Sequence, residues 1–264
     1  MVPTETTTRS AADEARPRYA SVGDYLRVIT RSVPAVTTGP AGRCIVAKSG
    51  GDFATIAAAT ASSRCAGGLI KVMPGTYVEN VNVGIGQHLL GAGRGLTIIQ
   101  AANAAAPVIT PANKAIIEGF TLTGGTSTVF LSCSGCAGAT VRIVDNDISG
   151  GTTNGIAMTQ YANAVIENNS IHDTPTAVNF YQYANPTLRN NVLYNVNIGV
   201  NLYYANAIID HNRIVTKGGA SDHGIYIGYS TANVNFNVVD KITNSYGTLT
   251  GKYNVTPTGA LVGP

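Results

Sequence analysis

Ile143-Val144-Asp145-Asn146-Asp147-Ile148 is the first of five copies of one short pattern in residues 141–239. The pattern is an apolar residue, two variable residues, an asparagine, one variable residue and an apolar residue. The later copies are Ile166–Ile171 (IENNSI), Leu188–Leu193 (LRNNVL), Ile209–Ile214 (IDHNRI) and the less regular Val234–Val239 (VNFNVV). Successive asparagines of the pattern, at positions 146, 169, 191, 212 and 237, are 23, 22, 21 and 25 residues apart. This spacing is typical of a solenoid whose coils repeat one structural unit.

A second pattern runs in phase with the first and alternates apolar residues with small or polar ones. It comprises Gly155–Met158 (GIAM), Ala177–Phe180 (AVNF), Gly199–Leu202 (GVNL) and Gly224–Ile227 (GIYI). Each repeat therefore contains two short strands separated by polar turn residues, as expected for coils that stack as parallel β-structure. Leucine-rich repeats have a different leucine and asparagine spacing, and helical repeats have longer units, so neither class fits.

These repeats, over Cys44–Thr250, resemble the right-handed parallel β-helix, or pectin-lyase-like, family. The resemblance implies an all-β fold, a right-handed parallel β-helix solenoid of about 8–9 coils with a short N-terminal capping helix. It also implies a structural ladder of stacked asparagines, in which side-chain amides can satisfy one another because each has donors and acceptors. The expected ladder residues are Asn146, Asn169, Asn191 and Asn212, with Phe120 at the equivalent position of an earlier coil.

The predicted cap lies before the repeats. Asp52 can serve as the N-cap of a helix that has Phe53, Ile56 and Ala59 on one face, and Pro74–Glu79 (PGTYVE) follows it. This block resembles the N-terminal cap of pectin methylesterases, in which a helix precedes such a strand turn. The helix is expected to cover the open apolar end of the solenoid and its unpaired strand edge.

The chain divides into an N-terminal arm (1–43), the β-helix (44–250) and a C-terminal tail (251–264). The start of the arm lacks the apolar segment of a Sec signal peptide, so we expect no such peptide. Charged residues make up 12% of the chain and its net charge is +3, without the dense basic stripe of nucleic-acid-binding proteins. No apolar run is long enough to span a membrane. We therefore expect neither nucleic acid nor a membrane as a partner.

Four cysteines are present, Cys44, Cys65, Cys133 and Cys136. The Cys133-Ser-Gly-Cys136 pair lacks further ligands at zinc-binding spacing and lacks the βαβ context of a redox dithiol. We expect free thiols or one or two disulfides, and Cys44 with Cys65 could close the first coil in an oxidising environment. No metal ion and no cofactor is expected.

Tyr-Ala-Asn recurs in three successive repeats, beginning at Tyr161, Tyr183 and Tyr204, and two more tyrosines, Tyr181 and Tyr203, lie just before the second and third copies. Stacked coils would place these rings in a column along one side of the solenoid. Such a column suits glycan binding or subunit contact, because tyrosine presents an apolar ring and a hydroxyl group. Ring stacking that only seals a turn is the third interpretation.

The catalytic motifs of the family are not found. The Asn-Thr-Asp, Asp-Asp and Arg-Ile-Lys motifs of polygalacturonases are missing, as are the motifs of pectin methylesterases and the acidic calcium cluster of pectate lyases. Lyases and epimerases of this fold can use Lys, Arg, His or Tyr to abstract the proton beside a uronate carboxylate. The runner-up catalytic site is therefore Arg213, Lys217, Asp222, His223 and Tyr226.

Two further sets of charged residues fall at repeated positions. Asp145 and Asp147 would point to the same side of a regular strand, as paired catalytic carboxylates do. Glu167, Arg189 and Asp210 would stack with alternating charge, which is the common way to keep a β-surface soluble and in register. We interpret the second set as structural.

The leading functional hypothesis is a non-enzymatic structural or attachment protein, because the chain has an aperiodic arm and no family catalytic motif. Viral spikes often use this fold, so a bacteriophage surface spike, fibre or capsid-decorating protein is the favoured setting. A homo-oligomer, with a trimer favoured, and docking to a larger particle through residues 1–43 are expected, at the virion surface or outside the cell after assembly. The alternatives are a polysaccharide lyase or epimerase acting on an acidic glycan, and a glycan-binding module without turnover.

Overall fold

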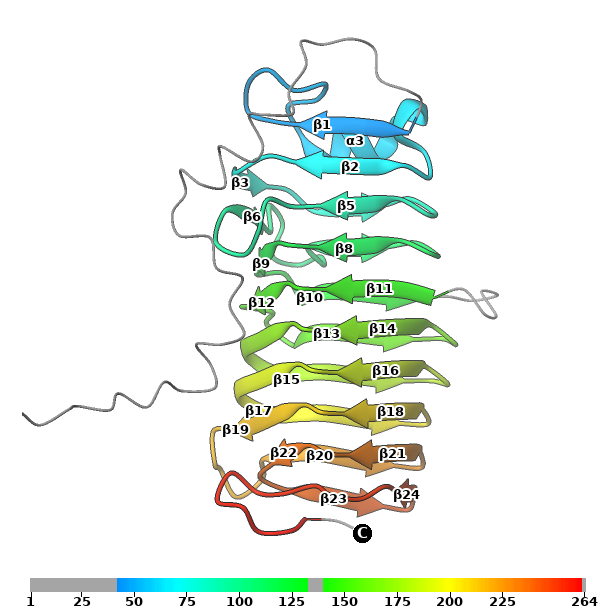
Figure 1. Cartoon of the computed structure of the whole chain (residues 1–264), viewed down its shortest axis with the longest axis vertical. Helices are drawn as coiled ribbons and strands as arrows, with labels where there is room; N and C mark the ends of the chain where they lie inside the picture. The colour runs from blue at the N-terminus through cyan, green and yellow to red at the C-terminus, as the bar shows by residue number, and fades with distance from the viewer. Residues whose placement is uncertain (1–41, 133–139, 263–264) are drawn as a thin grey trace, which may run out of the picture. The chain divides into compact units, whose positions relative to one another are not determined.

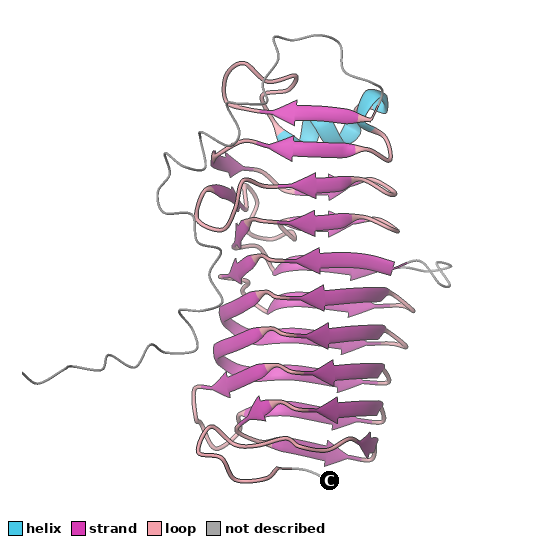
Figure 2. Cartoon of the chain, viewed as in Figure 1, coloured by secondary structure: helices cyan, strands magenta, loops and turns pink. Residues whose placement is uncertain are grey.

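The computed structural model describes residues 42–132 and 140–262. Within these ranges the chain winds into stacked coils whose strands pair in parallel with those of the next coil (Figure 1). Helical segments of the described residues lie beside the first coil, and the rest is strand and turn (Figure 2). The predicted all-β parallel solenoid is confirmed. The expectations for most of the N-terminal arm and for Cys133 and Cys136 lie outside the described residues.

One side of the solenoid is a ten-stranded sheet, called sheet A, to which every coil adds one strand in chain order. Side chains alternate between the core and the outside along these strands, so the apolar positions of the repeat stack in the interior. The strands are β1 (Arg43–Val46), β2 (Leu69–Val72), β5 (His88–Leu90), β8 (Ile116–Glu118), β11 (Thr140–Val144), β14 (Asn163–Glu167), β16 (Asn185–Arg189), β18 (Asn206–Asp210), β21 (Thr231–Asn235) and β24 (Thr248–Thr250).

The other two sides belong to one 14-stranded sheet, sheet B, because the long strands β15 and β17 bend around the corner between them. The second side contains β3 (Gly75–Val78), β6 (Thr97–Gln100), β9 (Thr121–Thr123), β12 (Asp147–Ser149), the first part of β15 (Ser170–Tyr181), the first part of β17 (Val192–Tyr203), β19 (Arg213–Thr216) and β22 (Val238–Val239). The third side contains β4 (Val81–Val83), β7 (Ile109–Pro111), β10 (Ser127–Ser132), β13 (Asn154–Thr159), the rest of β15 and β17, β20 (His223–Gly228) and β23 (Ile242–Ser245).

The asparagine ladder forms at the turn after sheet A. The Oδ1 atom of Asn191 accepts hydrogen bonds from the backbone N (2.9 Å) and from Nδ2 (3.1 Å) of Asn169 in the preceding coil. The Nδ2 atom of Asn191 lies 2.9 Å from the carbonyl oxygens of Ile166 and Arg189. Asn146 and Asn212 repeat this arrangement in their own coils. All of these amides are buried, so the ladder satisfies polar groups that water cannot reach.

The ladder is longer at both ends than its four predicted asparagines. At the N-terminal end the backbone N of Phe120 donates to Oδ1 of Asn146 at 3.0 Å, which confirms the ladder position predicted for Phe120. At the C-terminal end Asn237 donates to Asn254, which is buried and lies in the segment expected to be a tail. The last step spans 17 residues, so this coil is shorter than its predecessors.

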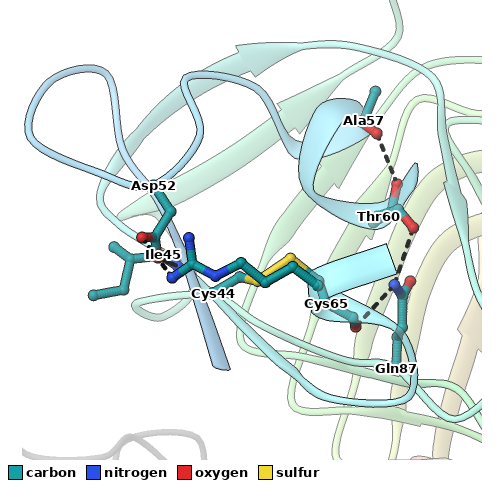
Figure 3. The surroundings of a disulfide bond; sticks show 8 residues. Cys44, Ile45, Asp52, Ala57, Thr60, Cys65 and Gln87 are labelled. Atoms are coloured by element: carbon teal, nitrogen blue, oxygen red, sulfur yellow. Dashed lines mark hydrogen bonds and ion pairs between the residues drawn. A yellow bond between two sulfur atoms is a disulfide. The ribbon is translucent and has the colours of Figure 1, made fainter. Parts of the chain in front are cut away.

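A disulfide and a short helix close the first coil. Cys44 of β1 is bonded to Cys65 of the 3₁₀ helix η1 (Ser63–Cys65), which follows α3 (Ile56–Ala61), as Figure 3 shows. The buried side chain of Gln87 ties the next coil to this cap, because its Nε2 donates to the carbonyl oxygens of Thr60 (3.0 Å) and Cys65 (3.2 Å). The predicted pairing of Cys44 with Cys65 is thus present.

The predicted N-cap of this helix was wrong. Thr55 is the N-cap, while Asp52 lies in the preceding loop, where it accepts from the backbone N of Ile45 (2.8 Å) and pairs with Arg64. The Glu79 carboxylate accepts from the backbone N of the first two helical residues at 3.0 and 2.8 Å. A carboxylate at this end also complements the helix dipole, so Glu79 has the role that the sequence pattern gave to Asp52.

Replacing Asn191 with Ala should lower the free energy of unfolding by roughly 3 to 5 kcal/mol, because it leaves the buried backbone N–H of Asn169 without its acceptor and removes the hydrogen bonds to the carbonyl groups of Ile166 and Arg189. Urea unfolding followed by circular dichroism measures the difference. Asn82→Ala, at an exposed position of β4, is the control and should change stability by less than about 0.5 kcal/mol. Equal effects of the two substitutions would contradict a stabilising role for the ladder.

Candidate functional site

An exposed column of tyrosines follows the turn that leads into sheet A. Each ring belongs to the residue two positions before a strand of that sheet. The rings form two stacks: Tyr161 and Tyr183 have centroids 5.1 Å apart, and Tyr204, Tyr229 and Tyr246 follow one another at 5.2 Å. Between 42% and 83% of each side chain is exposed, so the column is on the surface. We call it the tyrosine ridge; its members are Tyr161, Tyr183, Tyr204, Tyr229 and Tyr246.

All five ridge tyrosines have a left-handed backbone, with φ between 50° and 68°. This conformation suits glycine and asparagine and costs an ordinary residue roughly 1–2 kcal/mol. Tyr181 and Tyr203, the other two tyrosines predicted to make contacts, lie beside the ridge at the ends of β15 and β17. Their rings stack on each other at 5.4 Å, and the Tyr203 ring meets that of Tyr204 edge-on at 4.7 Å.

Neutral polar side chains border the tyrosine ridge. Gln160 and Gln182 precede ridge tyrosines and accept from Ser132 (2.7 Å) and Thr159 (2.8 Å), respectively. Other amides pair between coils on the third side and on sheet A, where Asn201 donates to Asn179 and Asn206 donates to Asn185. The ridge is therefore flanked by hydroxyl and amide groups, which can act as both donors and acceptors.

A second aromatic column lies across sheet A, at the turn after its last strands. The rings of His211 and Phe236 stack at 4.9 Å, and those of Phe236 and Tyr253 at 5.0 Å. These three residues also have a left-handed backbone. In earlier coils the same turn position holds Asp145, Asn168 and Asn190. The aromatic character of this turn is thus confined to the C-terminal coils.

A titratable cluster joins two coils on the second side. The His172 ring donates from Nε2 to Asp147 at 3.0 Å and from Nδ1 to Asp173 at 2.6 Å, and it stacks on the ring of Tyr194 at 4.6 Å. Asn195 donates to the same Asp173 carboxylate. Both ring nitrogens face carboxylates, and only the protonated imidazolium can donate from both.

The pKa values in this cluster move in the directions that the contacts require. The hydrogen bond to Asp147 raises the pKa of His172 above its ordinary 6.5, against the opposing effect of partial burial, and Asp173 adds to the rise. The hydrogen bond from His172 lowers the pKa of Asp147 and that of Asp173 below 3.8. The structure therefore favours an ion-paired cluster near neutral pH.

The predicted carboxylate pair of Asp145 and Asp147 was wrong. Asp145 has a φ of 55° and lies in the turn, so the strand is not regular there. Its carboxylate pairs with Arg94 at 2.7 Å, while that of Asp147 pairs with His172. Sequence reasoning missed the His172 cluster, because its members occupy different positions of the repeat. The signal that could have found it is the parallel register, which sets Asp147 and His172 two residues apart on adjacent strands.

The runner-up catalytic residues fall into two small groups on β19, β20 and the loop between them. Lys217 and Asp222 share a partner: the Asn197 amide lies 3.5 Å from the Lys217 ammonium and donates to Asp222 at 3.1 Å. The rings of His223 and Tyr226 are 5.3 Å apart and tilted.

The fifth runner-up residue and the electrostatics of the loop complete this region. Arg213 begins β19, and its exposed side chain makes no hydrogen bond or ion pair with another residue in the described ranges. Hydrogen bonds from the Gly219 backbone N and from Asn197 lower the pKa of Asp222 below 3.8. Partial burial and the nearby Lys241 lower the pKa of His223 below 6.5, so its imidazole is neutral at pH 7.

The charged residues in the row across sheet A have a structural role. Glu167, Arg189 and Asp210 occupy one row of sheet A, as predicted, and Arg189 pairs with Glu167 at 3.0 Å.

No cluster of three or more His, Cys, Asp or Glu residues suited to a metal ion occurs in residues 42–132 and 140–262. In the same ranges no helix has both the length and the hydropathy needed to cross a membrane.

Comparison with known proteins places the repeats in an established family. The family model described as a right-handed beta helix region matches residues 96–258. A search of curated proteins gives no match.

Solved structures share the fold at low sequence identity. Pectin methylesterase PemA from Erwinia chrysanthemi is 13% identical, with a TM-score of 0.59, over 87% of this chain and 94% of the enzyme. A pectin methylesterase in complex with a hexasaccharide is 15% identical, with a TM-score of 0.58, over 79% and 81% of the two chains. ORF18 of Geobacillus virus E2 is 12% identical, with a TM-score of 0.54, over 88% of this chain and 47% of its own. At these identities the likeness shows the fold alone.

The His172 cluster should make stability depend on pH. Because the pKa of His172 is raised in the folded protein, its contribution to stability is complete below pH 6.5 and is lost as the pH rises through that raised pKa. The contributions of Asp147 and Asp173 to stability are complete above pH 3.8 and are lost as the pH falls through their lowered pKa values in the folded protein. The difference in unfolding free energy between wild type and His172→Asn should be largest between these limits. A difference that does not change from pH 5 to pH 9, roughly the range over which histidine titrates, would contradict the assignment.

Proposed function

The chain belongs to the right-handed beta helix family, and from that premise we propose that it is a non-enzymatic attachment protein that binds a glycan through the tyrosine ridge. The fold supplies a rigid shaft on which equivalent turn residues recur once per coil. Glycan recognition uses aromatic rings against the apolar faces of sugars, and hydroxyl and amide groups for the sugar hydroxyls. The tyrosine ridge and its bordering amides offer both.

The observation that carries this proposal is the left-handed backbone of five exposed tyrosines. Ring stacking contributes about 0.5–1.5 kcal/mol per pair, which at best offsets the roughly 1–2 kcal/mol that the left-handed conformation costs each tyrosine. Asparagine at these positions would carry less strain and would need no offset, as in the turn after sheet A. Folding alone therefore does not favour tyrosine here, and strained, exposed residues are characteristic of binding sites.

The setting we propose is the surface of a bacteriophage particle. ORF18 of Geobacillus virus E2 supports it to the extent that a viral protein has the same fold. We further propose that the chain is a homo-oligomer, a trimer in the favoured case, and that residues 1–43 dock it to the particle. A stable oligomer of the whole chain that is lost when these residues are removed would support this part of the proposal.

Replacing Tyr183 and Tyr204 with Asn should reduce binding to the recognised polysaccharide at least about tenfold, because central aromatic contacts dominate such sites. Asparagine tolerates a positive φ, so the double variant should retain the unfolding free energy of wild type within about 1 kcal/mol. Binding is measured on an array of bacterial and plant polysaccharides. Tyr194→Ala, which removes an exposed ring away from the ridge, is the control and should bind as wild type does. Unchanged binding by the folded double variant would contradict the proposal.

The second candidate function is a polysaccharide lyase or epimerase acting on an acidic glycan. The neutral imidazole of His223 beside Tyr226 favours it, since a neutral histidine can accept a proton at pH 7. If this function is correct, wild type should change the chain length or uronate composition of an acidic polysaccharide, and His223→Gln should abolish the change. Absence of turnover on pectate, alginate and glycosaminoglycans would remove this candidate.

A further inference from the structure

The last three strands of sheet A differ from the earlier ones because aromatic residues lie at both of their ends. Three segments, each bounded by two aromatic residues, contain these strands. β18 lies within Tyr204–His211, β21 within Tyr229–Phe236 and β24 within Tyr246–Tyr253. The strands pair in register and lie side by side at the C-terminal end of the solenoid (Figure 1). We call their outer surface the framed face.

Apart from Asp210, the outward side chains of the framed face are neutral. Its outward residues include one exposed apolar side chain, Ile208, which is 49% exposed. Asp210 is the outward residue at the end of β18, and the others are amides and hydroxyls that alternate with less exposed residues along each strand: Asn206, Thr231, Asn233, Asn235, Thr248 and Thr250. A five-residue strand is roughly 17 Å long, so the face spans several sugar units from one aromatic column to the other.

The charges at the border of the framed face already have partners. The Asp210 carboxylate is 2.9 Å from Nδ1 of His211. The Lys252 ammonium lies over the Tyr253 ring, 5.4 Å from its centroid. The neighbouring coils towards the N-terminus, by contrast, carry the Glu167 and Arg189 pair on the same surface. The framed face thus lacks the group of exposed cations that an acidic polymer requires.

We propose that the framed face binds a short segment of a neutral polysaccharide, which contacts both aromatic columns. This inference rests on the proposed function and names its ligand class and its location. The ring columns contact the C–H faces of the sugars, and the asparagine and threonine groups hydrogen-bond their hydroxyls. A uronate carboxylate on this face would meet Asp210 and would find no unengaged cation to pair with, so a neutral ligand fits better than an acidic one.

The test compares ligands and variants by isothermal titration calorimetry. Neutral glucan, galactan and mannan fragments are titrated into the full chain beside polygalacturonate and alginate fragments. Phe236→Asn removes the central ring of the second column, and asparagine tolerates its positive φ. The control is Ile85→Asn, which replaces an exposed apolar residue near the other end of the solenoid. Unfolding midpoints are measured for each variant, so that only folded proteins are compared.

We expect at least one neutral fragment to bind, roughly tenfold weaker binding by Phe236→Asn, and no change with Ile85→Asn. If Tyr183→Asn with Tyr204→Asn weakens binding and Phe236→Asn does not, the framed face is not the site, but the proposed function stands. Tighter binding of acidic fragments overturns the ligand class alone. Absence of binding to any glycan overturns both proposals. Self-association of wild type that Phe236→Asn abolishes would identify a second copy of the chain as the occupant and would overturn this inference.

Discussion

The asparagine ladder is the interaction on which the rest of the structure depends. Each coil is closed by turns whose backbone groups are buried, and the ladder amides supply the hydrogen bonds that water cannot. Because Oδ1 of one asparagine binds both the backbone N and Nδ2 of the preceding one, neighbouring coils are held at one relative register. A one-residue slip of a strand would exchange its buried and exposed faces, so this constraint protects the whole apolar core.

Fixed register also decides what the surface of the solenoid can carry. It superposes equivalent turn residues, so side chains that are remote in sequence become neighbours at about the 4.8 Å spacing of adjacent strands. The turn before sheet A collects tyrosines, and the turn after it changes from Asp and Asn to aromatic residues at its C-terminal end. The second side, by contrast, carries His172 and its ionisable partner Asp147, and Asp173 follows His172 directly in the chain. One scaffold thus presents chemically distinct ridges.

The fold could be predicted because five successive coils, from Asn146 to Asn237, repeat the same requirement, an asparagine between apolar residues at a nearly constant period. The sequence prediction missed the C-terminal end of the ladder and the cap of the helix, because the residues that act there lie outside the repeated pattern. Asn254 follows a shorter coil of 17 residues without the flanking pattern, and Glu79 reaches the helix N-terminus from 23 residues away. The same limit applies to surfaces. Repeats placed Tyr161, Tyr183 and Tyr204 in a column, but the Asp147 and His172 contact joins unlike positions of two coils. No single-repeat pattern reveals such a contact.

We propose that the aromatic surface of the last coils is the functional feature of this β-helix. The chain has 13 tyrosines and no tryptophan. In protein labelled with ¹³C in its tyrosine rings, the NMR signals of those rings therefore report on that surface directly. The decisive measurement is a ¹H–¹³C spectrum of these rings during titration with the neutral polysaccharide that binds most tightly. The account predicts shifts for Tyr204, Tyr229 and Tyr253, and none for buried Tyr77 or for Tyr194. Shifts confined to Tyr226, beside His223, would contradict it and would direct attention to the second candidate function.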